Sequence, residues 1–280
     1  MINGFLLINK DHGITSSKVV QIIKKKFNLQ KVGHLGTLDP MATGLLIVAI
    51  NRATKFASLL LQSEKSYRAE VTLGIQTDTD DALGAVIFSK ENNLSKLEVK
   101  ETLLTFLGES NQYPPDYSAL KHKGKPMYKY ARDGIKVKKD ARKIFIKNIQ
   151  NISIELPKVS FDIECSKGTY IRSIARDLGL KLGCGAHLSK LTRTSQYKFI
   201  LAEACSLNDV DLGKLISLES AFEDLDSIKL NDDDSKALLH GRLIELDCNH
   251  TNLLRVYDSS NQFIAIGRNS SNGFKHEYLV

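Results

Sequence analysis

The sequence contains few cysteines, and none of them stands in a pattern typical of metal binding. The four cysteines lie at positions 165, 184, 205 and 248, without a CxxC pair or a Cys/His cluster of zinc-site spacing. The seven histidines are scattered, and no HExxH motif occurs. We therefore expect reduced, mostly buried thiols and no metal centre.

Long hydrophobic runs are also lacking. The longest apolar run extends from Gly44 to Ile50, far short of the roughly 20 residues that span a bilayer. The apolar residues 4–8 are too few for the core of a signal peptide, and no basic stretch precedes them. The sequence therefore predicts no association with a membrane and a cytoplasmic location.

Charge is present in excess and is unevenly spread. The net charge is +7, but residues 203–280 hold 14 acidic and 7 basic residues, a net of −7. Residues 1–202 hold 32 basic and 18 acidic residues, a net of +14. A strongly basic body suggests a polyanionic partner such as nucleic acid, although lysine-rich surfaces also serve solubility alone. Charge by itself leaves both interpretations open.

Hydrophobic patterning predicts strands and helices that alternate without a regular βαβ repeat. The pattern indicates strands at 5–8, 44–50, 67–73, 143–154 and 159–165, and helices from Thr15 onward and at 52–61, 94–107 and 169–182. Such a mixture favours an α+β fold with a central mixed, mostly antiparallel sheet.

The C-terminal part differs in composition from the body. A length of 280 residues is typical of a chain with about two domains. Short strand-like segments at 253–257 and 262–266 flank a turn, and residues 224–234 have the composition of a linker. We therefore predict a larger domain over residues 1–225 and a small β-rich domain over residues 226–280.

The densest chemical signal is the segment from Gly33 to Gly44, which reads GHLGTLDPMATG. It matches neither GxGxxG nor GxxxxGK[ST], so neither nucleotide-binding motif applies. One carboxylate, Asp39, remains in a glycine- and proline-restricted loop between a helix and a buried strand. Such a loop suits a rigidly placed nucleophile or base. An Asp-Pro turn without chemistry fits these residues as well.

Further blocks extend from about residue 4 to residue 195. They read FLLINK at 5–10, GITS at 13–16, KSYRA at 65–69, TDTDD at 77–81, YSALK at 117–121, CSKGTYIRSI at 165–174, LGCGAHL at 182–188 and LTR at 191–193. With the segment around Asp39, and in this order, they resemble the motifs of bacterial TruB-type tRNA pseudouridine synthases. Asp11 departs from that pattern, since the family usually has proline after the motif lysine.

The resemblance implies a pseudouridine-synthase catalytic domain followed by a small PUA-like RNA-binding domain. The implied activity is isomerisation of the uridine at position 55, in the T-loop of tRNA, to pseudouridine. No metal or organic cofactor is implied, and the implied state is a monomer that binds the tRNA T-arm without an obligate protein partner. The target base must leave the folded RNA before it can react. Whether the carboxylate attacks ribose C1′ or abstracts a proton to form a glycal stays open.

The resemblance also assigns catalytic roles to four side chains. Asp39 is the expected catalytic carboxylate, and Tyr67 is expected to stack on the flipped base. Tyr170 is expected to lie over the base and relay a proton. Arg172 is expected to hold Asp39, together with Asp81, by bidentate hydrogen bonds.

Other side chains are expected to contact the substrate. Leu191 would wall the pocket, and His34 would insert into the RNA loop where the base leaves, with Lys10 nearby. Lys55 and Arg193 are candidates for phosphate contacts. Taken alone, each of these residues also fits an ordinary core or surface position.

Basic residues interleaved with tyrosines occupy an insertion at about residues 112–143. Its first cluster, Lys121–Lys125, precedes Tyr128 and Tyr130, and a second cluster begins at Lys136. We expect this insertion, and Lys121 within it, to grip RNA phosphates, which would make binding steeply dependent on salt.

Two other classes of protein compete with this hypothesis. A tRNA-binding or folding factor without catalysis would leave Asp39 dispensable. A glycoside-processing enzyme would need a second carboxylate at a defined separation, and its substrate would not call for a basic body.

Overall fold

The computed structural model describes residues 2–118, 120–135, 137–246, 252–270 and 273–280. Its main sheet contains β1 (Gly4–Lys10), β2 (Val32–His34), β3 (Thr43–Ile50), β4 (Lys65–Leu73), β7 (Gly108–Gln112), β10 (Arg142–Glu155), β11 (Lys158–Cys165), β12 (Ala186–Gln196), β13 (Phe199–Ile200) and β14 (Cys205–Ser206). The order is β14–β1–β3–β12–β4–β11–β10–β7, with β2 on β3 and β13 on β12. The pairs β1–β14 and β3–β12 are parallel, and the other pairs are antiparallel. The predicted α+β fold with a mixed, mostly antiparallel sheet is confirmed.

Three helices close one core against this sheet: α1 (Ser16–Lys26), α3 (Lys96–Leu104) and α5 (Ile171–Lys181). The first begins as predicted, because the Thr15 side chain accepts the backbone N–H of Lys18. The expected helix at 94–107 is shorter, because Ser95 caps α3 one residue before its start. The expected helix at 52–61 is a 3₁₀ segment, η1 (Asn51–Phe56), followed by α2 (Ala57–Leu61).

Strand β3 is apolar from Gly44 to Ile50, and both of its faces are buried there. Leu46 and Val48 face the core that α1, α3 and α5 close. Leu45 and Ile47 face a second core, which α2 and α6 (Leu218–Ala221) cover. The sheet therefore packs on two sides at the point where the chain leaves the Asp39 loop.

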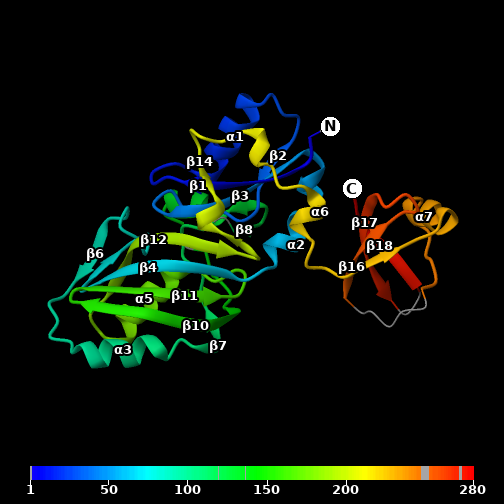
Figure 1. Cartoon of the computed structure of the whole chain (residues 1–280). Coiled ribbons are helices and arrows are strands. Elements are labelled where there is room, and N and C mark those ends of the chain that lie inside the picture. Colours follow the sequence, from blue (N-terminus) through cyan, green and yellow to red (C-terminus); the bar gives the residue numbers. More distant parts are fainter. Residues whose placement is uncertain (1, 119, 136, 247–251, 271–272) are drawn as a thin grey trace.

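The C-terminal part forms its own four-stranded sheet. It consists of β15 (Ser227–Lys229), β16 (Leu253–Tyr257), β17 (Phe263–Ser270) and β18 (Gly273–Leu279), with α7 (Asp232–Leu239) alongside. Figure 1 shows this sheet, in orange and red, beside α2 and α6 of the main body. The contact is aromatic, since the ring of Tyr278 stacks on that of Phe56 with centroids 5.3 Å apart.

The expected linker at 224–234 is wrong. Ser227–Lys229 pair in parallel with β16, and Asn231 caps α7 by accepting the backbone N–H of Asp234. These residues belong to the C-terminal sheet and its helix. The division of the chain at residues 225 and 226 stays a prediction.

Two excursions leave the main sheet. The first is a hairpin of β5 (Ile75–Thr77) and β6 (Val86–Ser89), which encloses the acidic turn at 77–84. The second is the insertion between β7 and β10, which holds β8 (Lys121–His122), β9 (Lys125–Pro126) and α4 (Met127–Arg132). Lys136, named above in the second basic cluster, lies outside the described residues. Within the described ranges, none of the helices has the length and apolarity needed to cross a membrane.

Candidate active site

Asp39 lies in the loop that joins β2 to β3, and its two neighbours are held by the first residue of α1 and by the turn before that helix. The hydroxyl of Ser16 donates to the Leu38 carbonyl at 3.0 Å and accepts the Leu38 N–H at 2.9 Å. The N–H of Gly13 donates to the Pro40 carbonyl at 2.8 Å. Backbone groups on both sides of Asp39 are therefore fixed, which gives the carboxylate a rigid support.

Arg172, in the first turn of α5, is the ion-pair partner of Asp39. Its Nε lies 2.8 Å from Asp39 Oδ2. Its Nη1 donates to the Thr79 carbonyl at 3.0 Å, and its Nη2 donates to the Tyr117 carbonyl at 2.8 Å. The expected bidentate bonding to carboxylates is therefore not the observed geometry, because the two terminal nitrogens serve backbone carbonyls. Asp81 Oδ2 stands 3.8 Å from Nη1.

The environment of Asp39 acts on its ionisation in two directions. Burial raises the pKa of the Asp39 carboxyl above its ordinary value, and the negative charge of Asp81 raises it further. The positive charge of Arg172 opposes this rise in pKa, and Lys10 does so to a smaller extent. The side chain of Asp39 is still 33% exposed, whereas that of Arg172 is 4% exposed. The carboxylate can therefore meet a ligand, while the guanidinium only supports it.

A cleft of about 260 Å³ opens beside this ion pair. Its lining includes Asp39, Tyr67, Tyr170, Arg172 and Leu191. The four sequence-predicted catalytic residues therefore converge on one cavity, although they come from three separate segments of the chain. The volume is slightly below the roughly 300–1,000 Å³ typical of small-molecule sites, which suits one base more than a large ligand.

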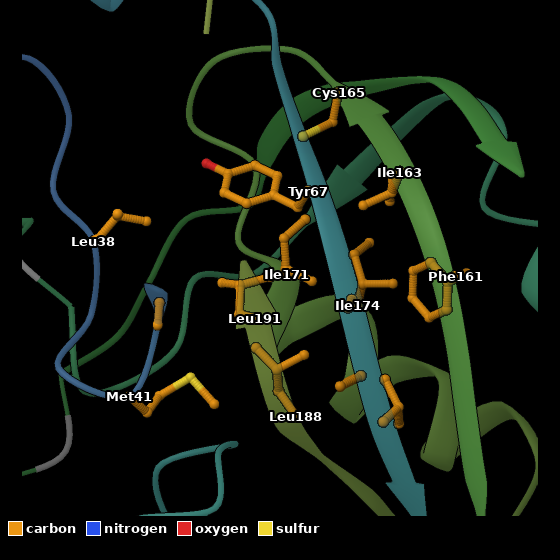
Figure 2. Close-up of a cluster of buried hydrophobic side chains, with 14 of the residues drawn as sticks. Leu38, Met41, Tyr67, Phe161, Ile163, Cys165, Ile171, Ile174, Leu188 and Leu191 are labelled. Atoms are coloured by element: carbon orange, nitrogen blue, oxygen red, sulfur yellow. The ribbon is translucent and has the colours of Figure 1, made fainter. Parts of the chain in front are cut away.

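Tyr67 and Leu191 form the apolar side of the cleft. Both side chains are 8% exposed and join the main core with Ile171. Figure 2 shows Tyr67 projecting from β4 toward the loop that carries Leu38. Burial raises the pKa of the Tyr67 phenol to about 12, so the ring is neutral at physiological pH. A neutral aromatic ring beside an aliphatic wall is a suitable surface for stacking a base.

Arg193 has a different place from the expected one. Its side chain is 1% exposed, its Nε donates to the Leu45 carbonyl at 2.6 Å and its Nη2 donates to the Gly36 carbonyl at 3.1 Å. It is also the register partner of Tyr67 on the neighbouring strand, and its positive charge acts on the Tyr67 phenol. Arg193 is therefore committed to the wall of the cleft, and in this conformation it is not placed to contact a phosphate on the surface.

Lys10 is likewise buried rather than available to RNA. Its side chain is fully buried, and its Nζ donates to the Asp11 carbonyl at 2.9 Å and the Ile14 carbonyl at 2.8 Å. Burial lowers the pKa of Lys10 to about 8, and the charge of Asp39 opposes that fall. Lys10 therefore holds the turn that supports the Asp39 loop, and its expected role at the RNA stays a prediction.

The remaining expected contacts lie outside the cleft lining formed by the described residues. His34, on β2, is half-buried, and burial followed by the charge of Arg193 lowers the pKa of its ring. Lys55 on η1 and Lys121 on β8 are exposed. Their assignment to RNA contacts stays a prediction.

The sequence reasoning missed Lys65 as a cleft residue. Its side chain is 8% exposed and lines the cleft, and its Nζ donates to the Ser63 carbonyl at 2.9 Å. Burial lowers the pKa of Lys65 to about 8. The position two residues before Tyr67 was the available signal, because alternate residues of a strand share one face.

Among the described residues, no group of three or more His, Cys, Asp or Glu side chains is arranged to hold a metal.

Solved structures with this fold give the class of the protein. A chain of the crystal structure of a Cbf5–Nop10–Gar1 complex matches with a TM-score of 0.74 and 26% identity, over 99% of this chain and 84% of that one. A chain of an H/ACA ribonucleoprotein bound to a substrate RNA that contains 2′-deoxyuridine matches with a TM-score of 0.73 and 25% identity, over 99% and 84%. The fold is thus shared with a chain of an H/ACA ribonucleoprotein and a chain of a Cbf5–Nop10–Gar1 complex.

Comparison of the sequence with models of protein families identifies the family of this chain. The model of the TruB family pseudouridylate synthase N-terminal domain matches residues 24–171. The tRNA pseudouridylate synthase B C-terminal domain matches residues 172–230, and the pseudouridine synthase II TruB C-terminal model matches residues 227–274. The chain belongs to the TruB family of pseudouridylate synthases.

Relatives share nearly the whole length of the chain. The tRNA pseudouridine synthase B of Clostridium kluyveri is 41% identical over 98% of this chain and 98% of its own length. The tRNA pseudouridine synthase B of Aromatoleum aromaticum is 39% identical over 98% of this chain and 91% of its own length.

Proposed function

We propose that this protein isomerises a uridine of tRNA to pseudouridine, and that the target is the uridine at position 55 in the T-loop. The observation that carries the proposal is the Asp39–Arg172 ion pair, at 2.8 Å, in a cleft walled by Tyr67 and Leu191. The family membership and the names of the relatives support the same reaction.

The reaction replaces the N1–C1′ glycosidic bond of the uridine by a C5–C1′ bond. The proton on C5 is released, and N1 ends the reaction carrying a proton. The base must be extruded for this exchange, which costs a few kcal/mol, and stacking on an aromatic ring offsets about 1–3 kcal/mol. Tyr67 is the aromatic ring that the cleft offers, with Leu191 beside it.

Asp39 is the group that we assign to the bond exchange. It reacts as the carboxylate, either at C1′ as a nucleophile or as the base that forms a glycal. Arg172 fixes the carboxylate and stabilises its charge. Tyr170 lies on the cleft wall, where its phenol can move a proton on the bound base, and burial raises the pKa of that phenol.

The basic body is the surface that we assign to the tRNA T-arm. Residues 1–202 carry a net charge of +14, and the exposed Lys121 and Lys55 are candidates for phosphate contacts. His34 is our candidate for insertion where the base leaves. The C-terminal sheet and its helix, residues 227–280, hold 7 acidic and 6 basic residues, a net of −1, so we assign them a part in docking rather than most of the phosphate contacts.

We further propose that the protein acts in the cytoplasm as a monomer, without an obligate protein partner. What supports a monomer is that Asp39, Tyr67, Tyr170, Arg172 and Leu191 all line the cleft from the same molecule. Light scattering at micromolar protein, with and without tRNA transcript, tests it. A dimer mass in both samples would overturn the monomer.

Tritium release tests the activity itself. A tRNA transcript labelled as [5-³H]uridine is incubated with wild type and with Asp39→Asn, and binding of the transcript is measured for both proteins. We expect release by wild type alone, with binding retained by the variant. Binding by both proteins with release by neither would replace the enzyme by a tRNA-binding or folding factor. Equal release by both would remove Asp39 from the reaction.

A further inference from the structure

The insertion between β7 and β10 joins the body at a narrow neck. Gln112 is the last residue of β7 and Arg142 is the first residue of β10, and the two are partners in the antiparallel register. The chain therefore leaves and re-enters the body at neighbouring positions. Just beyond the neck, the Tyr113 carbonyl accepts the Ser173 hydroxyl of α5 at 2.9 Å and Arg176 Nη2 at 3.0 Å. The start of the insertion is thus fastened to the helix that carries Arg172.

At this neck the Gln112 side chain bonds to both backbone polar groups of Tyr170. Its Nε2 donates to the Tyr170 carbonyl at 3.0 Å, and its Oε1 accepts the Tyr170 N–H at 2.8 Å. Gln112 is 3% exposed, so water competes little for these bonds. Tyr170 is the N-cap residue of α5, and its own side chain makes no capping bond. The Gln112 amide therefore fixes the backbone of Tyr170, which caps the start of α5 and lines the cleft.

Other insertion residues act on the same two cleft residues. Ser118 lines the cleft together with Tyr170. The Tyr117 carbonyl accepts from Arg172 Nη2 at 2.8 Å. The positive charge of Arg142, at the other side of the neck, acts on the Tyr170 phenol. The insertion and its neck thus hold Tyr170 at its backbone and Arg172 at its guanidinium.

We infer that Gln112 is a positioning residue for the reaction, which sets Tyr170 in the cleft and couples the grip of the insertion on RNA to the geometry of the active site. The inference rests on the proposed function, because Tyr170 and the insertion take their roles from it. Gln112 does not line the cleft and acts only through Tyr170. A buried amide with a structural role alone would add stability and leave turnover unchanged. A positioning role changes turnover, since a misplacement of about 1 Å at a reacting group can cost about 10²-fold.

Two variants separate these roles. Gln112→Met has a similar length and removes both hydrogen bonds without adding charge. Gln112→Glu keeps an acceptor for the Tyr170 N–H but loses the donor to the Tyr170 carbonyl. Gln150→Glu adds the same charge at an exposed position on β10 and is the matched control. For each protein, kcat is measured by tritium release and Kd by binding of the tRNA transcript.

We expect both Gln112 variants to lose about 10- to 100-fold in kcat. The Kd of Gln112→Met for the transcript should stay at the wild-type value, because Gln112 is buried and meets no phosphate. Gln150→Glu should keep the wild-type kcat. Fluorine NMR of 3-fluorotyrosine-labelled protein gives a second readout, with the Tyr170 and Tyr67 resonances assigned from Tyr170→Phe and Tyr67→Phe. The Tyr170 resonance should move in the Gln112 variants while that of Tyr67 stays in place.

The outcomes are distinct. A folded Gln112 variant with wild-type kcat, or with an unmoved Tyr170 resonance, overturns the positioning role. A loss of kcat that merely follows a loss of tRNA binding overturns it as well. If Gln112→Met does not fold, Gln112→Glu decides by the same two readouts. Absence of tritium release by the wild type would instead refute the proposed function, and the fluorine spectrum would still decide whether Gln112 holds Tyr170.

Discussion

Arg172 reaches Asp39 with a single nitrogen, its Nε at 2.8 Å from Oδ2, and uses the other two nitrogens to hold two separate loops. The Thr79 carbonyl belongs to the acidic turn after β5, and the Tyr117 carbonyl belongs to the insertion. One buried guanidinium therefore fixes the candidate catalytic carboxylate and joins it to both neighbouring loops. A planar fork with donors in fixed directions can do this, whereas an ammonium group cannot.

Arg172→Lys is therefore expected to reduce activity strongly although it keeps the charge. The lysine loses the fixed fork, so at least one loop carbonyl stays without its donor, and Asp39 loses its fixed geometry. We expect a fall in kcat of about 10²-fold or more and a loss of about 1–3 kcal/mol in the free energy of unfolding. Tritium release and urea denaturation measure the two effects.

Arg68→Lys is the matched control for this change. Arg68 pairs with Asp162 at 2.9 Å, but its side chain is 70% exposed, and such pairs contribute about 0–1 kcal/mol. Its replacement should leave kcat and the urea midpoint nearly unchanged. If Arg172→Lys behaved like Arg68→Lys, the three-way contact of Arg172 would have no role in catalysis.

The pH dependence of the reaction should reflect the raised pKa of Asp39. Burial and the charge of Asp81 both raise the pKa of the Asp39 carboxyl. The reaction requires the ionised carboxylate, so activity is present above this pKa and is lost as the pH falls through it. Asp81→Asn removes one cause of the rise in pKa. We expect the acid limb of the pH profile of kcat, measured by tritium release, to move to lower pH in this variant.

Asp78→Asn is the control for the pH shift. Asp78 lies in the same turn and accepts the Ala85 N–H at 2.8 Å, but it is exposed and is not among the charges that act on Asp39. The acid limb of the pH profile of kcat for Asp78→Asn should coincide with that of the wild type. An acid limb that stays in place, or moves to higher pH, in Asp81→Asn would contradict the assigned electrostatics.

Sequence patterns predicted the sheet well because strand alternation is local. Tyr67, Ala69 and Val71 alternate along β4, and all three side chains are buried on one face. The linker at 224–234 was mispredicted because Ser227–Lys229 become a strand only by pairing with β16, a contact across nearly thirty residues. Composition carries no information about such a partner.

The same limit applies to the candidate site. Asp39 and Arg172 could be named from motifs, but the motifs do not say that Arg172 Nη1 and Nη2 bind carbonyls. The resemblance placed Lys10 beside His34 at the RNA, and Arg193 was a candidate for a phosphate contact. Both are buried here, and each bonds to backbone carbonyls that other segments or turns bring to it. Backbone partners of this kind leave no pattern in a sequence.

Ser16→Ala tests whether the support behind Asp39 matters for turnover. Removal of the hydroxyl leaves the buried N–H and carbonyl of Leu38 without this partner, so we expect a loss of about 1–3 kcal/mol in stability. Because Leu38 precedes Asp39, kcat should fall as well, by about tenfold or more. Ser17→Ala, at the next and exposed position, should change neither quantity. A stability loss with wild-type kcat would show that the loop keeps its geometry without Ser16.

Lys121→Ala tests the insertion as a phosphate-binding surface. Each phosphate contact adds close to one unit to the slope of log Kd against log salt concentration, because bound counterions are released from the RNA. Loss of one contact should therefore weaken tRNA binding and reduce that slope by about 1. Lys229→Ala removes an equally exposed lysine from the acidic C-terminal part and should leave the slope unchanged. Filter binding between 50 and 300 mM salt, roughly the range over which such contacts are screened, measures both variants. An unchanged slope in Lys121→Ala would place the RNA elsewhere and would leave the contacts of the insertion with Tyr170 and Arg172 as its main contribution.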